Sequence, residues 1–202
     1  MRKLFILFFC VTSLVSAQKK SITNEDIWNG TFRTERLNEL SSMNGDYYSV
    51  LEMNYNTKST SVDKYSYATF EKIATIVDSK DLKEIAYFET YSFNSDETKL
   101  LLGVESESIY RHSSRGIYYT YDIASKKLQL VDADKIQEPT FSPDSKKIAF
   151  VKNNNIFIKN LETNELTQVT SDGVKNSIIN GICDWVYEEE FAFVKAFEWS
   201  TD

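Results

Sequence analysis

Seven residues near the carboxyl end of the chain, Asp184 to Glu190, read DWVYEEE and place four carboxylates beside two aromatic rings. In a short helical turn, neighbouring side chains lie about 100° apart around the axis, so adjacent glutamates can bracket one small cation. A primary ammonium suits such a site, because its three N–H donors can be satisfied by two carboxylates and one further acceptor. This chemistry predicts recognition of a free peptide amino terminus.

Arg111 is a second candidate, in the segment Tyr110-Arg111-His112-Ser113. Taken alone, neither feature is specific, since a glutamate triplet is usually a solvated face and an isolated arginine is usually a surface charge or an ion-pair partner. The residues around the glutamate triplet and around Arg111 make a binding role more specific.

The stretch NGICDWVYEEE, residues 180–190, closely resembles the double-glutamate motif of dipeptidyl peptidases of the IV type, in the prolyl oligopeptidase family of serine peptidases. The segment around Arg111 is similar to that family's aromatic-Arg-His-Ser segment, and the two motifs keep the family's order and a similar spacing. Residues 22–28 and 30–33 resemble the opening segment of bacterial members. The resemblance covers almost all of residues 18–202.

The resemblance implies roles for several residues. In the family, the substrate's free amine sits between two glutamates that match Glu189 and Glu190, and an arginine matching Arg111 contacts the neighbouring backbone carbonyl. Because two extended residues span about 7 Å, this clamp would act as a ruler that releases Xaa-Pro or Xaa-Ala dipeptides and rejects blocked amino termini. The supporting residues are Glu188, which should point elsewhere and hold the segment in place, together with Asp184, Trp185 and Tyr187.

Catalytic residues are absent from this sequence. It contains no Gly-x-Ser-x-Gly segment, and His112 is its single histidine, so a Ser-His-Asp triad cannot be assembled from it. A lone histidine beside an arginine is more often a packing or hydrogen-bonding residue than a base. No His/Cys/Asp cluster has metal-ligand spacing, and no phosphate or dinucleotide loop is present, so we expect no metal and no cofactor.

Residues 1–17 are predicted to be a signal peptide. Arg2 and Lys3 precede an apolar stretch from Leu4 to Val15 that is too short to span a bilayer, and Val15-Ser16-Ala17 offers a cleavage site. The expected product is residues 18–202, exported to the periplasm or the extracellular space. An uncleaved signal anchor is the alternative.

The charge of the chain limits the classes of partner that it can bind, and its cysteine content limits the disulfides that it can form. The chain has 30 acidic and 23 basic residues, which argues against nucleic acid or an anionic membrane as a partner. Cleavage would leave Cys183 as the single cysteine, which excludes an internal disulfide and favours a small buried apolar side chain.

The rest of the chain predicts an all-β fold with a repeat. Residues 93–102 align with 141–150 at an offset of 48: each has an aromatic residue, a Ser/Asp turn and an apolar strand, and a second hairpin follows. Four strands in each period of roughly 40–50 residues indicate propeller blades. A helix is expected mainly near 25–40. The predicted strands are 100–104, 117–121, 147–151 and 155–159, with hairpin partners at 127–131 and 165–169.

Trp199 to Asp202 restart the turn motif, so about three blades and the start of a fourth fit in this length. A propeller needs about four to eight blades to close. We therefore expect a fragment, and the resemblance implies that the remainder is the rest of an eight-bladed propeller and a carboxyl-terminal α/β-hydrolase domain of the same chain. It also implies a homodimer, as is common among members.

Two functions stay open for the whole protein. One is a serine-type dipeptidyl aminopeptidase, with this segment as its amino-terminal propeller portion and inactive alone. The other is a non-catalytic propeller that binds peptides or serves as an interaction scaffold. The acidic pair and Arg111 favour the first, because a scaffold has no need of an amine clamp.

Overall fold

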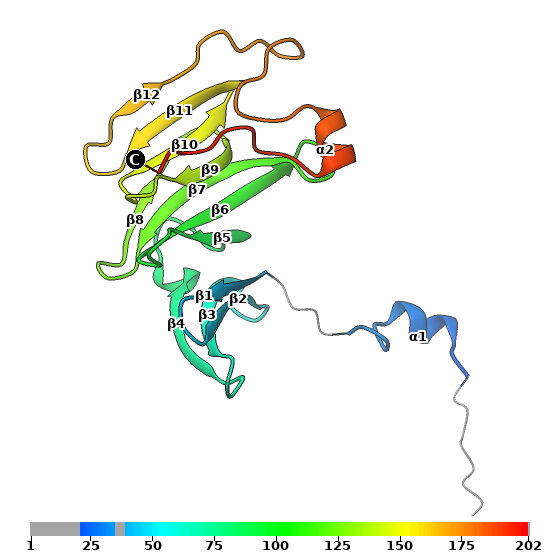
Figure 1. The fold of residues 1–202 in the computed structure, drawn as a ribbon. Coiled ribbons are helices and arrows are strands. Elements are labelled where there is room, and N and C mark those ends of the chain that lie inside the picture. The colour runs from blue at the N-terminus through cyan, green and yellow to red at the C-terminus, as the bar shows by residue number, and fades with distance from the viewer. Residues whose placement is uncertain (1–20, 35–38, 202) are drawn as a thin grey trace, which may run out of the picture. The chain divides into compact units, whose positions relative to one another are not determined.

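A computed structural model describes residues 21–34 and 39–201 of the chain (Figure 1). The chain divides into two units, Met1–Arg36 and Leu37–Asp202. The predicted signal peptide lies outside the described residues. No helix in the described ranges is both long and apolar enough to cross a membrane.

The described part of the first unit holds one short helix, α1 (Asn24–Trp28). Its start is fixed by a capping box, in which the Thr23 hydroxyl accepts from the Asp26 N–H at 3.1 Å and the Asp26 carboxylate accepts from the Thr23 N–H. The helix ends at Asn29, and Gly30 follows with a φ of +84°. Within the described residues the helix expected near 25–40 is therefore shorter than expected, because this Asn-Gly pair stops it after about one turn; residues 35–38 lie outside the described ranges.

The second unit consists mainly of three four-stranded antiparallel sheets, each built from consecutive strands (Figure 1). This arrangement confirms the predicted all-β fold of about three four-stranded blades. The first sheet is β1 (Leu40–Met43), β2 (Tyr47–Asn54), β3 (Ser59–Ser66) and β4 (Lys72–Asp78). The second is β5 (Thr90–Phe93), β6 (Lys99–Ser108), β7 (Ser114–Asp122) and β8 (Lys127–Leu130), and the third is β9 (Gln137–Phe141), β10 (Lys147–Lys152), β11 (Asn155–Asn160) and β12 (Leu166–Gln168). A 3-10 turn, η1 (Ser79–Asp81), follows β4, and a helix, α2 (Trp185–Phe191), follows the third sheet.

The repeated Ser/Asp turn has the same construction in the second and third sheets. Between β5 and β6, the Asn94 side-chain oxygen accepts from the backbone N–H of Lys99 at 2.8 Å. Between β9 and β10, the Ser142 hydroxyl accepts from the N–H of Lys147 at 2.9 Å. The Asn94 amide also donates to the Ser145 hydroxyl at 2.9 Å, which ties one sheet to the next.

The core lies between successive sheets. One buried cluster joins the first two sheets and includes Val62, Val77, Leu100 and Leu102. A second joins the second and third sheets through Leu101, Ile136, Ile148 and Phe150. Residues 100–102 of β6 therefore alternate between the two clusters, as a strand covered on both faces must.

Candidate functional site

Arg111 lies in a five-residue loop, residues 109–113, that joins β6 to β7. The two strands pair up to Ser108 and Ser114, and the Ile109 N–H donates to the Ser113 carbonyl at 2.9 Å. These bonds close the loop at its base, so the side chain of Arg111 projects from the end of a long, paired hairpin.

The acidic run forms α2, which lies beside the end of the β6–β7 hairpin (Figure 1). Asp184 is the N-cap, since its carboxylate accepts from the N–H of Tyr187 at 3.0 Å. Ala192 is the C-cap, with a φ of +56°, and it donates its N–H to the Glu188 carbonyl at 3.0 Å. Asp184, expected in a supporting role, is thus placed where it fixes the start of the helix.

Glu188 points inward and is 1% exposed. Its Oε1 accepts from the backbone N–H of His112 at 2.6 Å and from that of Ser113 at 2.9 Å. The helix and the loop are therefore joined by two charge-assisted hydrogen bonds. The contribution of His112 to this contact is its backbone N–H.

Burial alone would raise the pKa of the Glu188 carboxyl, but the Ser113 hydroxyl and the two N–H groups that face it hold the pKa below its usual value. The Ser113 hydroxyl is buried and makes no hydrogen bond of standard geometry within the described residues. Its proximity nevertheless favours the ionised form of the neighbouring carboxylate.

Glu189, the next residue of α2, faces the guanidinium group of Arg111. The Nη2 atom of Arg111 lies 3.4 Å from Oε2 of Glu189, with the arginine side chain 70% exposed and the glutamate side chain 19% exposed. Glu190 follows a further 100° around the helix and is exposed. The site therefore combines two adjacent carboxylates and one guanidinium, an arrangement that can accept an ammonium group and donate to a carbonyl oxygen.

Trp185 and Tyr187 are both exposed beside these carboxylates. The ring of Tyr187 lies 5.8 Å from that of Phe191, and Phe191 lies 6.0 Å from Phe193. Tyr187, Phe191 and Phe193 therefore form a row of exposed rings along and just after α2. Phe191 and Phe193 were not among the predicted site residues, although they follow the glutamate triplet directly in the sequence.

Glu138 is a charged neighbour of the site that the sequence did not reveal. It is a half-buried residue of β9, and burial is the main cause that raises the pKa of its carboxyl, with Lys195 opposing and Glu188 adding to the rise. The equivalent position in the preceding repeat is Thr90, so the repeat pattern did not predict a carboxylate at position 138.

Cys183, expected to be buried, is only half-buried, with its Sγ 3.9 Å from the Lys195 carbonyl.

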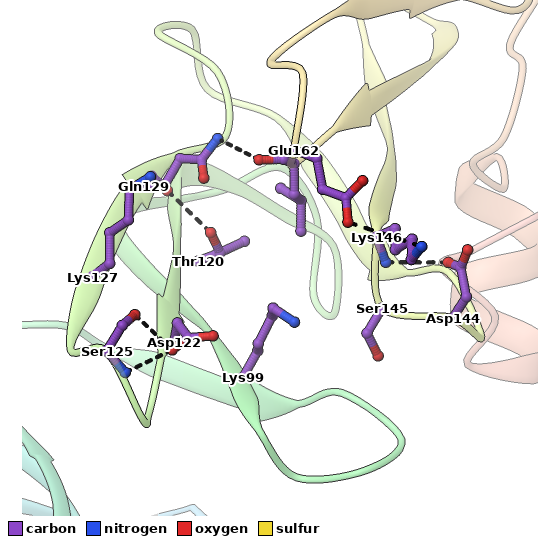
Figure 2. A pocket seen from close by; sticks show the side chains of 11 residues that line it. Lys99, Thr120, Asp122, Ser125, Lys127, Gln129, Asp144, Ser145, Lys146 and Glu162 are labelled. Carbon is purple, nitrogen blue, oxygen red and sulfur yellow. Dashed lines mark hydrogen bonds and ion pairs between the residues drawn. The ribbon is translucent and has the colours of Figure 1, made fainter.

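A groove of about 330 Å³ between the second and third sheets lies at the opposite end of β6 and β7 (Figure 2). Its polar groups bond to one another: Ser125 donates to Asp122, and Gln129 donates to the Leu161 carbonyl at 3.3 Å. Because β6 has ten residues at about 3.3 Å each, the groove and the Arg111 loop are about 30 Å apart. The groove is a seam between blades and is separate from the candidate site.

No group of three or more metal-ligand side chains occurs within residues 21–34 and 39–201.

Comparison with known proteins gives consistent matches. The family model described as the dipeptidyl peptidase IV N-terminal region matches residues 94–202. The probable dipeptidyl-aminopeptidase B of Talaromyces marneffei is 33% identical over 137 residues, covering 65% of this chain and 15% of the relative. That of Trichophyton verrucosum is 39% identical over 114 residues, or 54% of this chain and 13% of the relative.

Among solved structures, the crystal structure of Porphyromonas gingivalis dipeptidyl peptidase 4 is similar, with a TM-score of 0.75 and 36% identity. The match covers 87% of this chain and 25% of the other. The chain therefore spans between about one eighth and one quarter of the length of these relatives.

Proposed function

The chain belongs to the dipeptidyl peptidase IV N-terminal region family, and from this membership we propose that it forms the substrate amino-terminus clamp of a serine-type dipeptidyl peptidase. The proposed enzyme is exported by the signal peptide at residues 1–17 and removes Xaa-Pro or Xaa-Ala dipeptides from peptides with a free amino terminus. The nucleophile comes from an α/β-hydrolase domain in the same polypeptide. This chain alone has no triad and does not hydrolyse peptides.

In the proposed complex, the substrate ammonium lies between the carboxylates of Glu189 and Glu190, and the guanidinium of Arg111 donates to the carbonyl of the first substrate residue. Holding the amine at a fixed place sets the distance to the scissile bond at two residues, about 7 Å. A blocked amino terminus lacks both the charge and the donors for this contact. When a substrate is bound, the exposed rings of Trp185 and Tyr187 can cover part of the clamp, and the loss of water there strengthens its charged contacts.

The observation that carries this proposal is the 3.4 Å approach of Arg111 to Glu189, two residues that lie in distant segments of the sequence. An ion pair with an exposed arginine and a 3.4 Å separation contributes only about 0–1 kcal/mol. A substrate ammonium can therefore replace the guanidinium as the partner of Glu189 at little cost, leaving Arg111 free to turn to the substrate carbonyl.

The test is steady-state kinetics of the proposed intact peptidase, with Gly-Pro-anilide as substrate. Glu189→Gln and Glu190→Gln should each lower kcat/KM by about 100-fold or more, because each removes a charge-assisted contact in a partly dehydrated site. Glu165→Gln is the matched control, since Glu165 is exposed in the turn between β11 and β12. Unchanged kinetics in both clamp variants would remove the assignment.

A non-catalytic propeller that binds peptides or assembles with other proteins is the second candidate. It would keep amine binding at Glu189 and Glu190 but would show no hydrolysis of Gly-Pro-anilide in the whole protein. A homodimer is compatible with both candidates, and sedimentation of the whole protein measures it.

A further inference from the structure

Glu188 uses its carboxylate differently from the two glutamates that follow it. It is buried, and a single oxygen accepts two backbone N–H groups from consecutive residues, His112 at 2.6 Å and Ser113 at 2.9 Å. Successive N–H groups converging in this way are a common backbone arrangement for binding an anion. Here the anion is supplied by α2 of the same chain.

The covalent neighbours of these groups are the clamp residues themselves. Arg111 immediately precedes His112 in the loop, and Glu189 immediately follows Glu188 in the helix. The contact between Arg111 and Glu189 is exposed on its arginine side and is 3.4 Å long, so it is too weak to hold two segments in register. The buried contact beside it can do so, because its donors and acceptor are shielded from competing water.

We infer that Glu188 is a positioning residue of the amine clamp: its carboxylate fixes the 109–113 loop against α2 and so sets the separation between Arg111 and Glu189. The effect on substrate rests on the function proposed above. The effect on the loop does not, and it can be measured without any ligand.

Amide hydrogen exchange by NMR tests the loop contact in the full chain. We expect the amides of His112 and Ser113 to be protected, and to exchange about tenfold faster or more in Glu188→Ala. Glu188→Gln keeps one acceptor oxygen and should lie between the two. Glu165→Gln should leave both amides unchanged.

The amide of Leu102 in the core of β6 reports whether a variant is still folded. If Glu188→Ala is unfolded, the comparison of Glu188→Gln with the native chain decides the test. Native protection of His112 and Ser113 in a folded Glu188→Ala or Glu188→Gln chain would overturn the inference.

A double-mutant cycle with Gly-Pro amide tests the effect on the clamp. Glu188→Gln should weaken binding about tenfold when Arg111 is present, which is within the range for residues in one hydrogen-bond network, and should have no further effect in an Arg111→Ala chain. Equal weakening in both backgrounds would mean that Glu188 does not act through Arg111, and would overturn the inference. If the native chain binds no Gly-Pro amide, the proposed function fails, and the exchange measurement alone decides the role of Glu188.

Discussion

The guanidinium of Arg111 lies 3.4 Å from the carboxylate of Glu189, although one residue belongs to a hairpin loop and the other to a helix that follows the third sheet. In the free protein this ion pair occupies part of the position that we assign to a substrate ammonium. Binding must therefore exchange one cation for another at Glu189. Arg111 then becomes available to the neighbouring carbonyl.

Replacement of Arg111 tests this exchange. Arg111→Ala should lower kcat/KM of the proposed intact peptidase for Gly-Pro-anilide by about 10- to 100-fold, because the substrate carbonyl loses a charged donor. Arg111→Lys should recover only part of the loss, since an ammonium cannot reproduce the planar fork of donors.

The matched control is Arg115→Ala. Arg115 lies on the same hairpin and is also exposed, but it pairs with Glu107 through two hydrogen bonds at 3.1 and 3.0 Å. An equal loss of activity in Arg115→Ala would show that charge on the hairpin, and not the position of Arg111, is what the enzyme requires.

The pH dependence of stability should reveal the buried carboxylate of Glu188. Its folded-state pKa is held below the ordinary value of 4.5, so its ionised form stabilises the fold above that pH, and this stabilisation is lost as the pH falls through the folded pKa. Glu188→Gln should therefore be less stable than the native chain at pH 7, and the two unfolding free energies should converge as the pH falls through the folded-state pKa of Glu188.

Urea unfolding of both chains between pH 3 and pH 7 measures this difference. Charged and titratable neighbours, namely His112, Glu138 and Cys183, are common to both chains and largely cancel in the comparison. A difference that stays constant from pH 7 to pH 3 would contradict an ionised Glu188 in the folded state.

Asn94 should matter for the seam between the second and third sheets. Its side chain closes the β5–β6 turn and also reaches Ser145, so Asn94→Ala should lower the unfolding free energy by about 1–2 kcal/mol, because these hydrogen bonds are lost and the N–H of the half-buried Lys99 loses its acceptor. Asn94→Ser should cost less, because the repeat uses Ser142 for the same turn. Urea unfolding at pH 7 gives both values, and equal destabilisation by the two substitutions would contradict the equivalence of the turns.

The strands and the repeat of the second and third sheets could be predicted because each of these sheets carries the same turn motif followed by an apolar strand. Phe93 and Phe141 precede the same kind of turn, and the following strands are apolar enough to be covered on both faces. The first sheet gave no such signal: its tight turn between β1 and β2 uses Gly45 at a φ of +78° in place of the Ser/Asp motif. The helix expected near 25–40 forms only at its start, as α1, because the apolar spacing did not account for the Asn29-Gly30 stop.

The site was only partly accessible to sequence reasoning. Residue types pointed to Glu189, Glu190 and Arg111, and helical geometry indicated that Glu188 must face elsewhere. The partners of Glu188 could not be found in this way, because they are backbone N–H groups of His112 and Ser113, and every residue except proline has one.

The most direct test of the account is an NMR titration of residues 18–202 with Gly-Pro amide and, separately, with N-acetyl-Gly-Pro amide. We predict that the free-amine ligand shifts resonances of α2 and of the 109–113 loop, and that the acetylated ligand, which lacks the ammonium donors, does not. Equal responses to both ligands, or shifts confined to other parts of the chain, would contradict the assignment of Glu189 and Glu190 as an amine clamp.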